Sequence, residues 1–315
     1  MLNIIIIGFG NIGFRHFQSL MNQKEKSNII IVDHNIKNKK KIAKVRNTKK
    51  HIITFDDKLS SYKLVFDFAI IATNSDVRLK VISKLKDLNK IKFLLIEKMV
   101  TYKIEEYQKI TKILKKNKII TYVNFIRREF LFYSKLKTLL KNDLFRITIN
   151  YSNLGLCSNS IHFLDLFCLL TGVNNIQLKK NLLYNNIYRS KRNGFFEFKG
   201  SLVFISAKGH ELVINDRINQ LNKNLIIIDT NKKQFIIDES KKIFKISINS
   251  KVKKMKVDTK LVSETTNIIL KKIITNKEIK LKKIENSFNN HKILIKLFNN
   301  HFNKLNKKSL TFKIT

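Results

Sequence analysis

The sequence predicts an α/β protein in two parts: an N-terminal doubly wound parallel sheet, then an α+β domain with a large, mostly antiparallel open sheet. Three observations predict it. Buried strands alternate with helices up to residue 123, which produces a parallel sheet covered on both faces. A glycine-rich turn follows the first strand. Between residues 200 and 249, short strands succeed one another without helices. We predict domains 1–123 and 124–315, with the last helices packing back on the first domain.

The first strand and its glycine turn are the strongest local signal. Four consecutive β-branched residues, 4–7, indicate a strand buried on both faces. Gly8, Gly10 and Gly13 follow with the spacing of a dinucleotide-binding turn, in which they allow the tight turn, the close approach of a pyrophosphate and helix packing. Asn11 suits the helix start, where N–H groups and the helix dipole attract an anion. The candidate cofactor-binding residues of the turn are Gly8, Phe9, Gly10, Asn11, Ile12 and Gly13.

A second buried strand, 29–32, follows a predicted helix over 12–21 and ends in Asp33. Asp33 comes 20 residues after Gly13, where a carboxylate binds the adenosine ribose. It repels a 2′-phosphate, which favours NAD, whereas the nearby His34, Lys37 and Lys39 offset that repulsion and leave NADP as an alternative. The competing interpretation is that the glycines serve packing alone and Asp33 caps the turn after its strand.

Polar residues stand at the ends of the next predicted strands, 66–73, 93–96 and 119–123, which alternate with helices over 77–88 and 104–116. The carboxyl ends of parallel strands share one edge of a sheet, where ligands of doubly wound folds bind. We therefore expect the side chains at these ends to line the cofactor crevice, with Thr73, Asn74 and Glu97 as further cofactor-binding candidates, beside Lys98 and Asn124.

The pattern changes after Asn124. A helix to about residue 141 and a strand over 145–151 precede a helix predicted for 161–171, because Ser158, Asn159 and Ser160 suit a helix start and Gly172 a helix end. His162 and Asp165 lie three residues apart and so share a face of this helix. Strands are predicted at 202–206, 211–215, 225–229, 234–238 and 243–248, and closing helices at 261–274 and 285–303.

Composition limits the classes of function. The 315 residues, 43% of them hydrophobic, suffice for two cores. No stretch has the roughly 18 apolar residues of a membrane span, and the N-terminus lacks a secretion signal, so we predict a cytoplasmic protein. Cys157 and Cys168 make neither a disulfide scaffold nor a four-ligand zinc site, and no metal is expected.

The net charge is +40, from 63 Lys and Arg against 23 Asp and Glu, which raises a polyanion-binding protein as an alternative. The lysines are spread over every segment, and the chain lacks proline and tryptophan, which fits a coding bias towards A and T. We favour the coding bias as the origin of the positive charge, and we expect no specific nucleic-acid binding.

Several motifs together resemble the Gfo/Idh/MocA oxidoreductases. They are Gly8–His16, Ala72-Thr73-Asn74-Ser75, Glu97-Lys98-Met99, Asn124 with Arg127-Arg128, Ile161–Leu166, and Ile284–Ser287 with His291-Lys292. The resemblance implies a Rossmann domain followed by a domain whose open sheet often mediates homodimers or homotetramers. It implies reversible hydride transfer between NAD(P) and a hydroxyl or keto carbon of a sugar or cyclitol.

Lys98 matches the lysine of the family's Glu-Lys-Pro motif, and His162 matches its catalytic histidine. A hydroxyl proton must leave as hydride leaves the carbon, which a neutral imidazole achieves while an ammonium group stabilises the alkoxide. The alternatives are that Lys98 is a solvated lysine and that His162 is satisfied by Asp165. Two residues depart from the family: Met99 replaces the usual proline, and Ser158 replaces an aspartate four residues before the histidine in many members. Some branches in polysaccharide sugar pathways resemble this chain here.

The sequence therefore predicts an NAD(P)-dependent oxidoreductase acting on a sugar or sugar nucleotide, in surface-polysaccharide sugar synthesis. A dinucleotide-binding relative without catalysis, and the polyanion-binding protein, remain the alternatives. The substrate-binding candidates are Arg127, Arg128, Asn159 and Asp165. Arg127 and Arg128 are either ordinary surface charge or hold an anionic group such as a nucleotide diphosphate.

Overall fold

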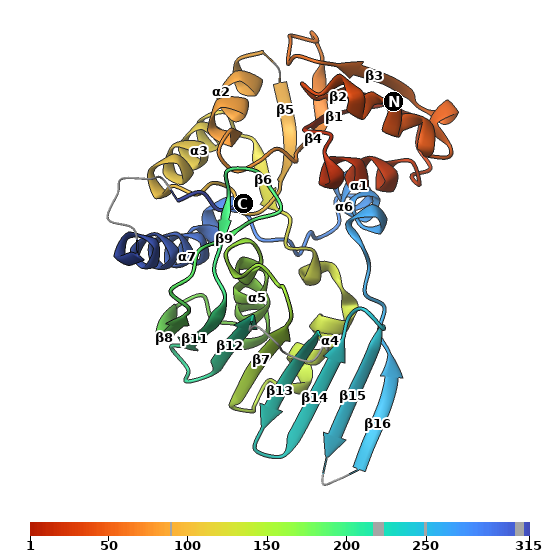
Figure 1. The fold of residues 1–315 in the computed structure, drawn as a ribbon. Coiled ribbons are helices and arrows are strands. Elements are labelled where there is room, and N and C mark those ends of the chain that lie inside the picture. The colour runs from red at the N-terminus through yellow and green to blue at the C-terminus, as the bar shows by residue number, and fades with distance from the viewer. Residues whose placement is uncertain (89, 217–223, 249–250, 306–311) are drawn as a thin grey trace. The chain divides into compact units, whose positions relative to one another are not determined.

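The computed structural model describes residues 1–315 except 89, 217–223, 249–250 and 306–311 (Figure 1). It divides into two compact units, each built from two stretches of chain. The first comprises Met1–Glu129 and Lys260–Ser287, and the second Phe130–Thr259 and Phe288–Thr315. The segment 260–287 thus belongs to the N-terminal unit, although it follows the whole strand-rich region in sequence.

The first unit is built on a six-stranded sheet of order β3-β2-β1-β4-β5-β6, all of whose pairs are parallel. This is the doubly wound order, in which the connections reverse direction between β1 and β4 and leave a crevice at the carboxyl ends. The predicted parallel Rossmann sheet is confirmed. The strands are β1 (Leu2–Ile7), β2 (Ser27–Val32), β3 (Ile52–Asp56), β4 (Val65–Ile71), β5 (Lys90–Ile96) and β6 (Ile120–Val123).

Helices lie along this sheet in two groups (Figure 1). One group is α2 with α3, and the other is α1 with the short helix η4 and α6. The core shared by α1, the sheet and α6 includes Ile4, Phe17 and Leu270, all at most 1% exposed. The helices are η1 (Ile36–Lys44), η2 (Thr48–Lys50), η3 (Ile126–Glu129), η4 (Val262–Glu264), α1 (Asn11–Leu20), α2 (Arg78–Leu88), α3 (Ile104–Lys116) and α6 (Thr266–Ile274).

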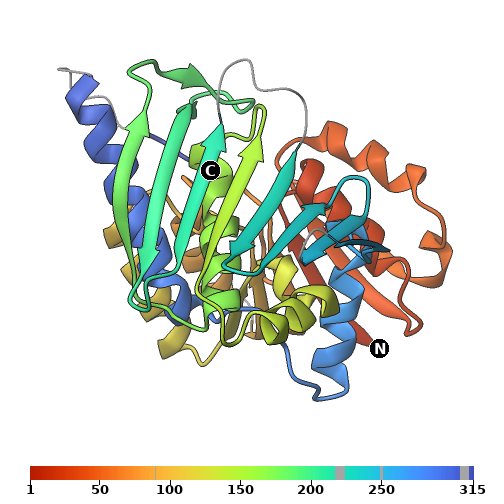
Figure 2. The ribbon, with the colours of Figure 1, turned by 90° about the horizontal axis from the view of Figure 1, so that it is seen from below.

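The second unit is built on an eight-stranded sheet of order β16-β15-β14-β13-β7-β12-β11-β8 (Figure 2). Every pair is antiparallel except β7 with β12, which confirms the predicted large, mostly antiparallel sheet. Its strands are β7 (Phe145–Tyr151), β8 (Ile176–Leu183), β11 (Gly200–Ser206), β12 (Glu211–Asp216), β13 (Leu225–Thr230), β14 (Lys233–Asp238), β15 (Ile243–Ile248) and β16 (Lys251–Lys256). A small ribbon pairs β9 (Tyr188–Arg189) with β10 (Phe196–Glu197).

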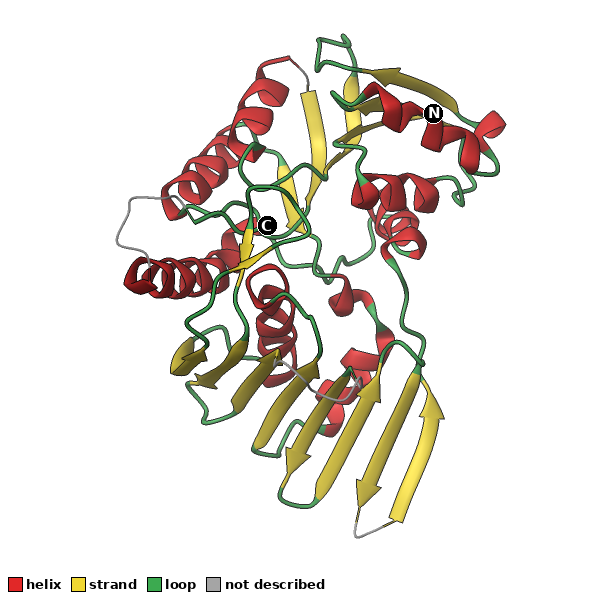
Figure 3. Ribbon diagram, in the orientation of Figure 1, coloured by secondary structure: helices red, strands yellow, loops and turns green. Residues whose placement is uncertain are grey.

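Helices α4 (Leu131–Leu139) and α5 (Leu156–Thr171) lie on one face of the eight-stranded sheet, and no described helix of this unit covers the other face (Figures 2 and 3). Buried residues accordingly alternate with more exposed ones along central strands such as β7, in which Phe145, Ile147 and Ile149 are buried. The boundary between the units falls within α7 (Ile284–Leu305).

Three of the four edge strands of the two large sheets were missed by sequence reasoning, and the fourth, β6, was predicted. β3, β8 and β16 each border a sheet, and the lysine-rich sequences of β8 and β16 lack the apolar alternation of a half-buried strand. Lysines are a known device for blocking unwanted pairing at an edge. The start of the helix predicted at 161 was also wrong: α5 begins five residues earlier, at Leu156, because its first turn is capped by another element rather than by its own serines.

Candidate active site

The glycine turn between β1 and α1 requires glycine at two positions. Gly8 has φ +90°, and a Cβ there would lie 2.8 Å from the backbone nitrogen of Thr73. A Cβ on Gly13 would lie 1.9 Å from the carbonyl oxygen of Gly8, so a side chain would separate the helix from the turn. Gly10 differs, because a Cβ there would meet nothing within 4 Å. The backbone at Gly10 is therefore open to the close approach of a ligand.

Asp33 holds this turn directly. Its carboxylate accepts a hydrogen bond from the backbone N–H of Phe9 and another, at 2.8 Å, from that of Asn35. The side chain is almost buried, at 8% exposed for the residue. An ionised carboxylate has about four lone-pair positions, so Asp33 retains capacity for ribose hydroxyls. Asp33 thus fixes the turn, and its contact with an adenosine ribose stays a prediction.

The residues at this turn fit a dinucleotide. Gly10 is the N-cap of α1, and the first turn of this fully described helix carries no acidic side chain. The positive end of the helix dipole and the backbone N–H groups of the first turn are suited to a pyrophosphate. The open space at Gly10 and the carboxylate of Asp33 supply the remaining requirements of an NAD-type site, namely a close approach and a ribose acceptor.

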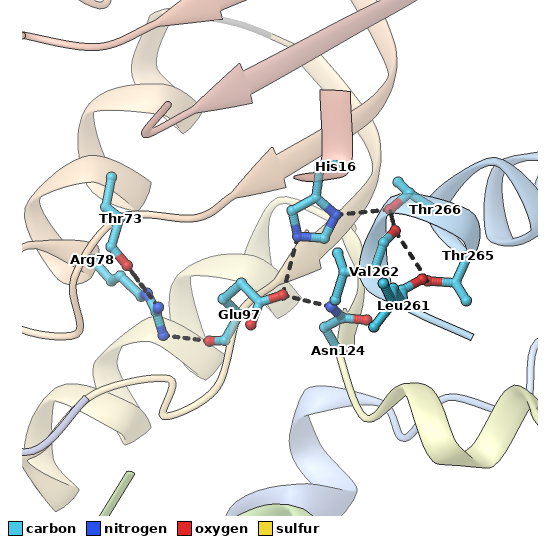
Figure 4. Close-up of polar contacts among 9 residues, drawn as sticks. All are labelled: His16, Thr73, Arg78, Glu97, Asn124, Leu261, Val262, Thr265 and Thr266. Carbon is cyan, nitrogen blue, oxygen red and sulfur yellow. Dashed lines mark hydrogen bonds and ion pairs between the residues drawn. The ribbon is translucent and has the colours of Figure 1, made fainter. Parts of the chain in front are cut away.

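A buried polar network lies at the carboxyl end of β5 (Figure 4). Glu97 accepts from the amide of Asn124 at 2.5 Å and contacts His16 Nε2 at 3.0 Å, while His16 Nδ1 lies 2.8 Å from the hydroxyl of Thr266. His16 is fully buried and Glu97 is 8% exposed. Four segments distant in sequence are thus joined beside Lys98.

The charge of Glu97 is stabilised by this network. Burial opposes ionisation, but the hydrogen bond and charge of His16, with contributions from Asn124 and Lys98, outweigh it and hold the pKa of Glu97 below its usual range. An ionised carboxylate accepts hydrogen bonds only, so His16 donates from Nε2. The Glu97 carboxylate faces into the unit, and its direct contact with a cofactor stays a prediction.

Arg78 fixes the backbone on both sides of Lys98. This residue is 2% exposed and donates from Nη1 to the carbonyls of Glu97 and Met99. It also donates to the carbonyl of Thr73 at the end of β4, from Nε at 3.1 Å and Nη2 at 2.7 Å. The peptide bond between Lys98 and Met99 is cis. Lys98 itself is half-buried. One arginine therefore ties the ends of two neighbouring strands and the segment that carries the candidate catalytic lysine.

In the second unit, a carboxylate from β10 caps the helix that carries His162. Glu197 accepts from the backbone N–H of Cys157 at 2.8 Å, from that of Ser158 at 3.4 Å, and from the hydroxyl of Ser158. Burial, together with the charge of Glu197, raises the pKa of the Cys157 thiol well above its usual value, so this cysteine remains a thiol. The hydroxyl of Ser158 is thereby joined to a carboxylate.

The predicted substrate residues fall into both units. Asn159 donates to the carbonyl of Leu154 at 2.6 Å, His162 is half-buried, and Asp165 is 1% exposed within α5. Arg127 and Arg128 are half-buried in η3 of the first unit. Within the first unit the structure gathers the turn residues, Asp33 and Thr73 at one edge of the sheet, with Glu97 and Lys98 at the end of the neighbouring β5. Asn74 is exposed in the same turn as Thr73.

Sequence reasoning missed the supporting residues His16, Arg78 and Glu197. A signal existed for His16, because Gly13, His16, Phe17 and Leu20 form the buried face of α1 and a histidine on such a face needs polar partners. Arg78 and Glu197 gave no comparable local signal. The described residues contain no group of three or more His, Cys, Asp or Glu able to hold a metal ion, and none of the described helices is long and apolar enough to cross a membrane.

The strand order and the glycine turn define the first unit as a dinucleotide-binding domain. Residues 2–125 match the profile of the Gfo/Idh/MocA oxidoreductase family, described as having an NAD-binding Rossmann fold. Residues 2–125 are therefore similar to the NAD-binding domain of this family, and the description of that domain agrees with the expected NAD-type cofactor.

Solved structures share the whole fold at low sequence identity. UDP-N-acetylglucosamine 3-dehydrogenase from Acidithiobacillus ferrooxidans aligns with a TM-score of 0.71 at 13% identity, over 94% of this chain and 96% of that chain. Biliverdin reductase from Synechocystis, with biliverdin and NADP+, gives 0.71 at 10% identity over 95% and 98%. An oxidoreductase from Agrobacterium radiobacter, with NAD+, L-tartaric acid and magnesium, gives 0.68 at 12% over 96% and 97%. No curated protein sequence matches this chain significantly.

Proposed function

We propose that this protein is an NAD(P)-dependent dehydrogenase or reductase that acts on a CH–OH group of a sugar or sugar nucleotide, in surface-polysaccharide sugar synthesis. The observation that carries the proposal is the position of Lys98. It follows β5 at the carboxyl edge of an NAD-binding sheet, and Glu97 and Arg78 fix the segment that holds it. A lysine positioned by buried neighbours at a cofactor edge differs from the many exposed lysines elsewhere in the chain.

The bound nicotinamide would supply the hydride acceptor or donor. We assign the remaining work to two side chains. His162, as a neutral imidazole, takes the proton of the substrate hydroxyl, and the ammonium group of Lys98 stabilises the negative charge that develops on that oxygen. In the opposite direction Lys98 polarises the carbonyl and His162 returns the proton. Glu97 and Arg78 position Lys98 and touch no reacting atom.

The substrate class is inferred from the chemistry of four side chains. Arg127 and Arg128 carry the planar guanidinium groups that bind diphosphates in a bidentate manner, and Asn159 and Asp165 share the helix of His162. The structural likeness to a UDP-N-acetylglucosamine 3-dehydrogenase agrees with a sugar nucleotide, and the likeness to a biliverdin reductase extends beyond sugars. A cytoplasmic location agrees with the two buried free thiols, Cys157 and Cys168.

Replacement of Lys98 by alanine tests the proposal. We expect turnover of a responsive sugar nucleotide, found by screening with NAD(H) and NADP(H), to fall at least about 100-fold, while NADH affinity stays within about twofold. The matched control is Lys92→Ala, since Lys92 lies in β5, the strand that precedes Lys98, and is exposed and paired with Asp67 at 2.8 Å. Unchanged turnover in Lys98→Ala would remove Lys98 from the mechanism.

A relative that binds the dinucleotide without catalysis is the second candidate, because Ser158 and Met99 replace family residues. Hydride exchange between a labelled cofactor and any sugar-like substrate excludes it. The polyanion-binding alternative rests on the net charge of +40. It requires affinity for DNA or anionic vesicles above that of a scrambled lysine-rich control at about 0.15 M salt.

A further inference from the structure

The segment after β2 carries five lysines, and one of them behaves differently from the rest. Lys37, Lys39, Lys40 and Lys44 of η1 are exposed. Lys41 is half-buried, and its ammonium group donates to the carbonyl oxygen of Phe9 at 3.2 Å. Phe9 is the second residue of the glycine turn. Among the lysines of this basic segment, Lys41 therefore contacts the backbone of the glycine turn, whereas the other four are exposed to solvent.

Phe9 is held from both sides by opposite charges. Its N–H donates to the carboxylate of Asp33, and its carbonyl accepts from Lys41. Standard backbone dimensions then place the carboxylate and the ammonium group within about 10 Å of each other. Phe9 itself cannot move away, because its buried ring packs edge-on against Phe14 and Phe17 with centroids 5.9 and 5.5 Å apart. The ammonium group of Lys41 and the carboxylate of Asp33 thus lie on either side of Phe9, whose position is fixed by packing.

NADPH differs from NADH only at the 2′ position of the adenosine ribose, where Asp33 is predicted to bind. Its 2′-phosphate replaces the ribose hydroxyl that a carboxylate such as Asp33 accepts, and brings negative charge next to that carboxylate. A nearby cation is needed to offset the repulsion. Lysine is a flexible point charge with three rotatable donors, so exchanging one carbonyl contact for a phosphate oxygen requires only side-chain rotation.

We propose that Lys41 is the specificity-determining residue for the cofactor, because its ammonium group binds the 2′-phosphate and allows this protein to use NADPH as well as NADH. The proposal rests on the dinucleotide site of the proposed function and deepens it. Asp33 serves NADH through the ribose hydroxyls, and Lys41 serves NADPH through the phosphate. The exposed lysines of η1 contribute only general, salt-sensitive attraction.

Calorimetric titration of the full chain with NADH and NADPH, at about 0.15 M salt, tests this. In Lys41→Met we expect NADPH affinity to fall about 10-fold or more, while NADH affinity stays within about twofold; one phosphate–lysine contact is of this size. The matched control, Lys44→Met, removes an exposed lysine of the same segment and should change neither affinity more than about twofold. Lys41→Arg should retain NADPH binding.

Adenosine 2′,5′-bisphosphate and 5′-AMP serve as smaller probes that separate the phosphate effect from the nicotinamide end. Selective loss of the bisphosphate in Lys41→Met supports the proposal. Equal losses for both cofactors would mean that Lys41 only steadies the turn, and no loss would mean that it is a bystander; either overturns the proposal and leaves the proposed function intact. A wild-type protein that binds neither NADH nor NADPH would contradict the proposed function itself.

Discussion

The two sheets of this molecule differ in how helices cover their faces. The parallel sheet of the first unit has helices along it in two groups, and β1 and β2 each end in four consecutive buried residues. The eight-stranded sheet of the second unit carries α4 and α5 on one face, while its other face has no described helix of that unit. The first arrangement gathers polar groups at strand ends, and the second carries its candidate residues on one helix.

The candidate catalytic residues are positioned in correspondingly different ways. Lys98 depends on a buried network that joins residues 16, 97, 124 and 266, so its geometry is set by contacts up to 250 residues apart. His162 depends on α5, whose first turn is capped by Glu197 from 39 to 40 residues away. A buried charged network loses much when one member is removed, whereas a partly exposed cap loses less. Substitutions in the Glu97 network should therefore cost more stability than substitutions in the cap of α5.

The largest effect is expected for His16→Ala. Its removal leaves the Glu97 carboxylate buried with fewer partners, which typically costs about 3–5 kcal/mol. Urea unfolding of the full chain measures the loss, and turnover should fall with it because Lys98 loses its support. A double-mutant cycle with Glu97→Gln should show strong coupling. A loss below about 1 kcal/mol would mean that the network is loosely packed and that the two sites differ little.

Acid should act on the same network. The pKa of Glu97 lies below its unfolded value of 4.5, so its ionisation stabilises the fold. That contribution is fully present above about pH 4.5 and is lost as the pH falls through the lower folded value. Other carboxyls with lowered pKa values, Asp67 and Glu211, contribute in the same direction. The difference in stability between wild type and Glu97→Gln should therefore shrink on acidification, and a constant difference would argue that Glu97 is uncharged.

A smaller effect is expected for Glu197→Gln. The variant keeps the shape of the side chain but removes the charge that caps α5, and such caps contribute about 0.5–2 kcal/mol. Hydrogen exchange should accelerate at the first turn of α5, near Cys157 and Ser158, and stay unchanged in α1. Ser158→Ala removes one hydrogen bond of the same cap and should cost less. Global destabilisation as large as that of His16→Ala would show that Lys98 and His162 are positioned by similar means.

The smallest effect on stability is expected for substitutions on the open face of the eight-stranded sheet, which is the face opposite α4 and α5. A row of half-buried cross-strand neighbours lies there, apolar except for one threonine: Val203, Val213, Thr148, Ile227 and Ile236. We expect this row to mediate the homodimer or homotetramer that the family resemblance of the sequence implies. Ile227→Lys should shift the molar mass measured by light scattering towards the monomer and change the stability of the monomer by no more than about 0.5 kcal/mol. The control is Lys245→Glu, on the neighbouring exposed position. An unchanged molar mass would remove this face as the interface.

The sequence by itself determined the features that depend on neighbouring residues. The apolar run 4–7, the glycine spacing and the position of Asp33 predicted the doubly wound sheet and its turn, because strand burial, positive φ and helix dipoles are local properties. The helix 104–116 and the strand 145–151 were predicted with the bounds that the structure shows.

Tertiary structure alone decided the contacts that give those features their partners. No local pattern joins His16 to Thr266, Glu197 to the start of α5, or Lys41 to Phe9. Edge strands such as β16 escaped prediction because exposure on both faces removes the apolar alternation by which a strand is recognised. Helices and strands were predictable where their burial leaves a pattern of apolar residues along the sequence. The polar partners were not, because a buried donor or acceptor is satisfied by whichever segment the fold brings to it.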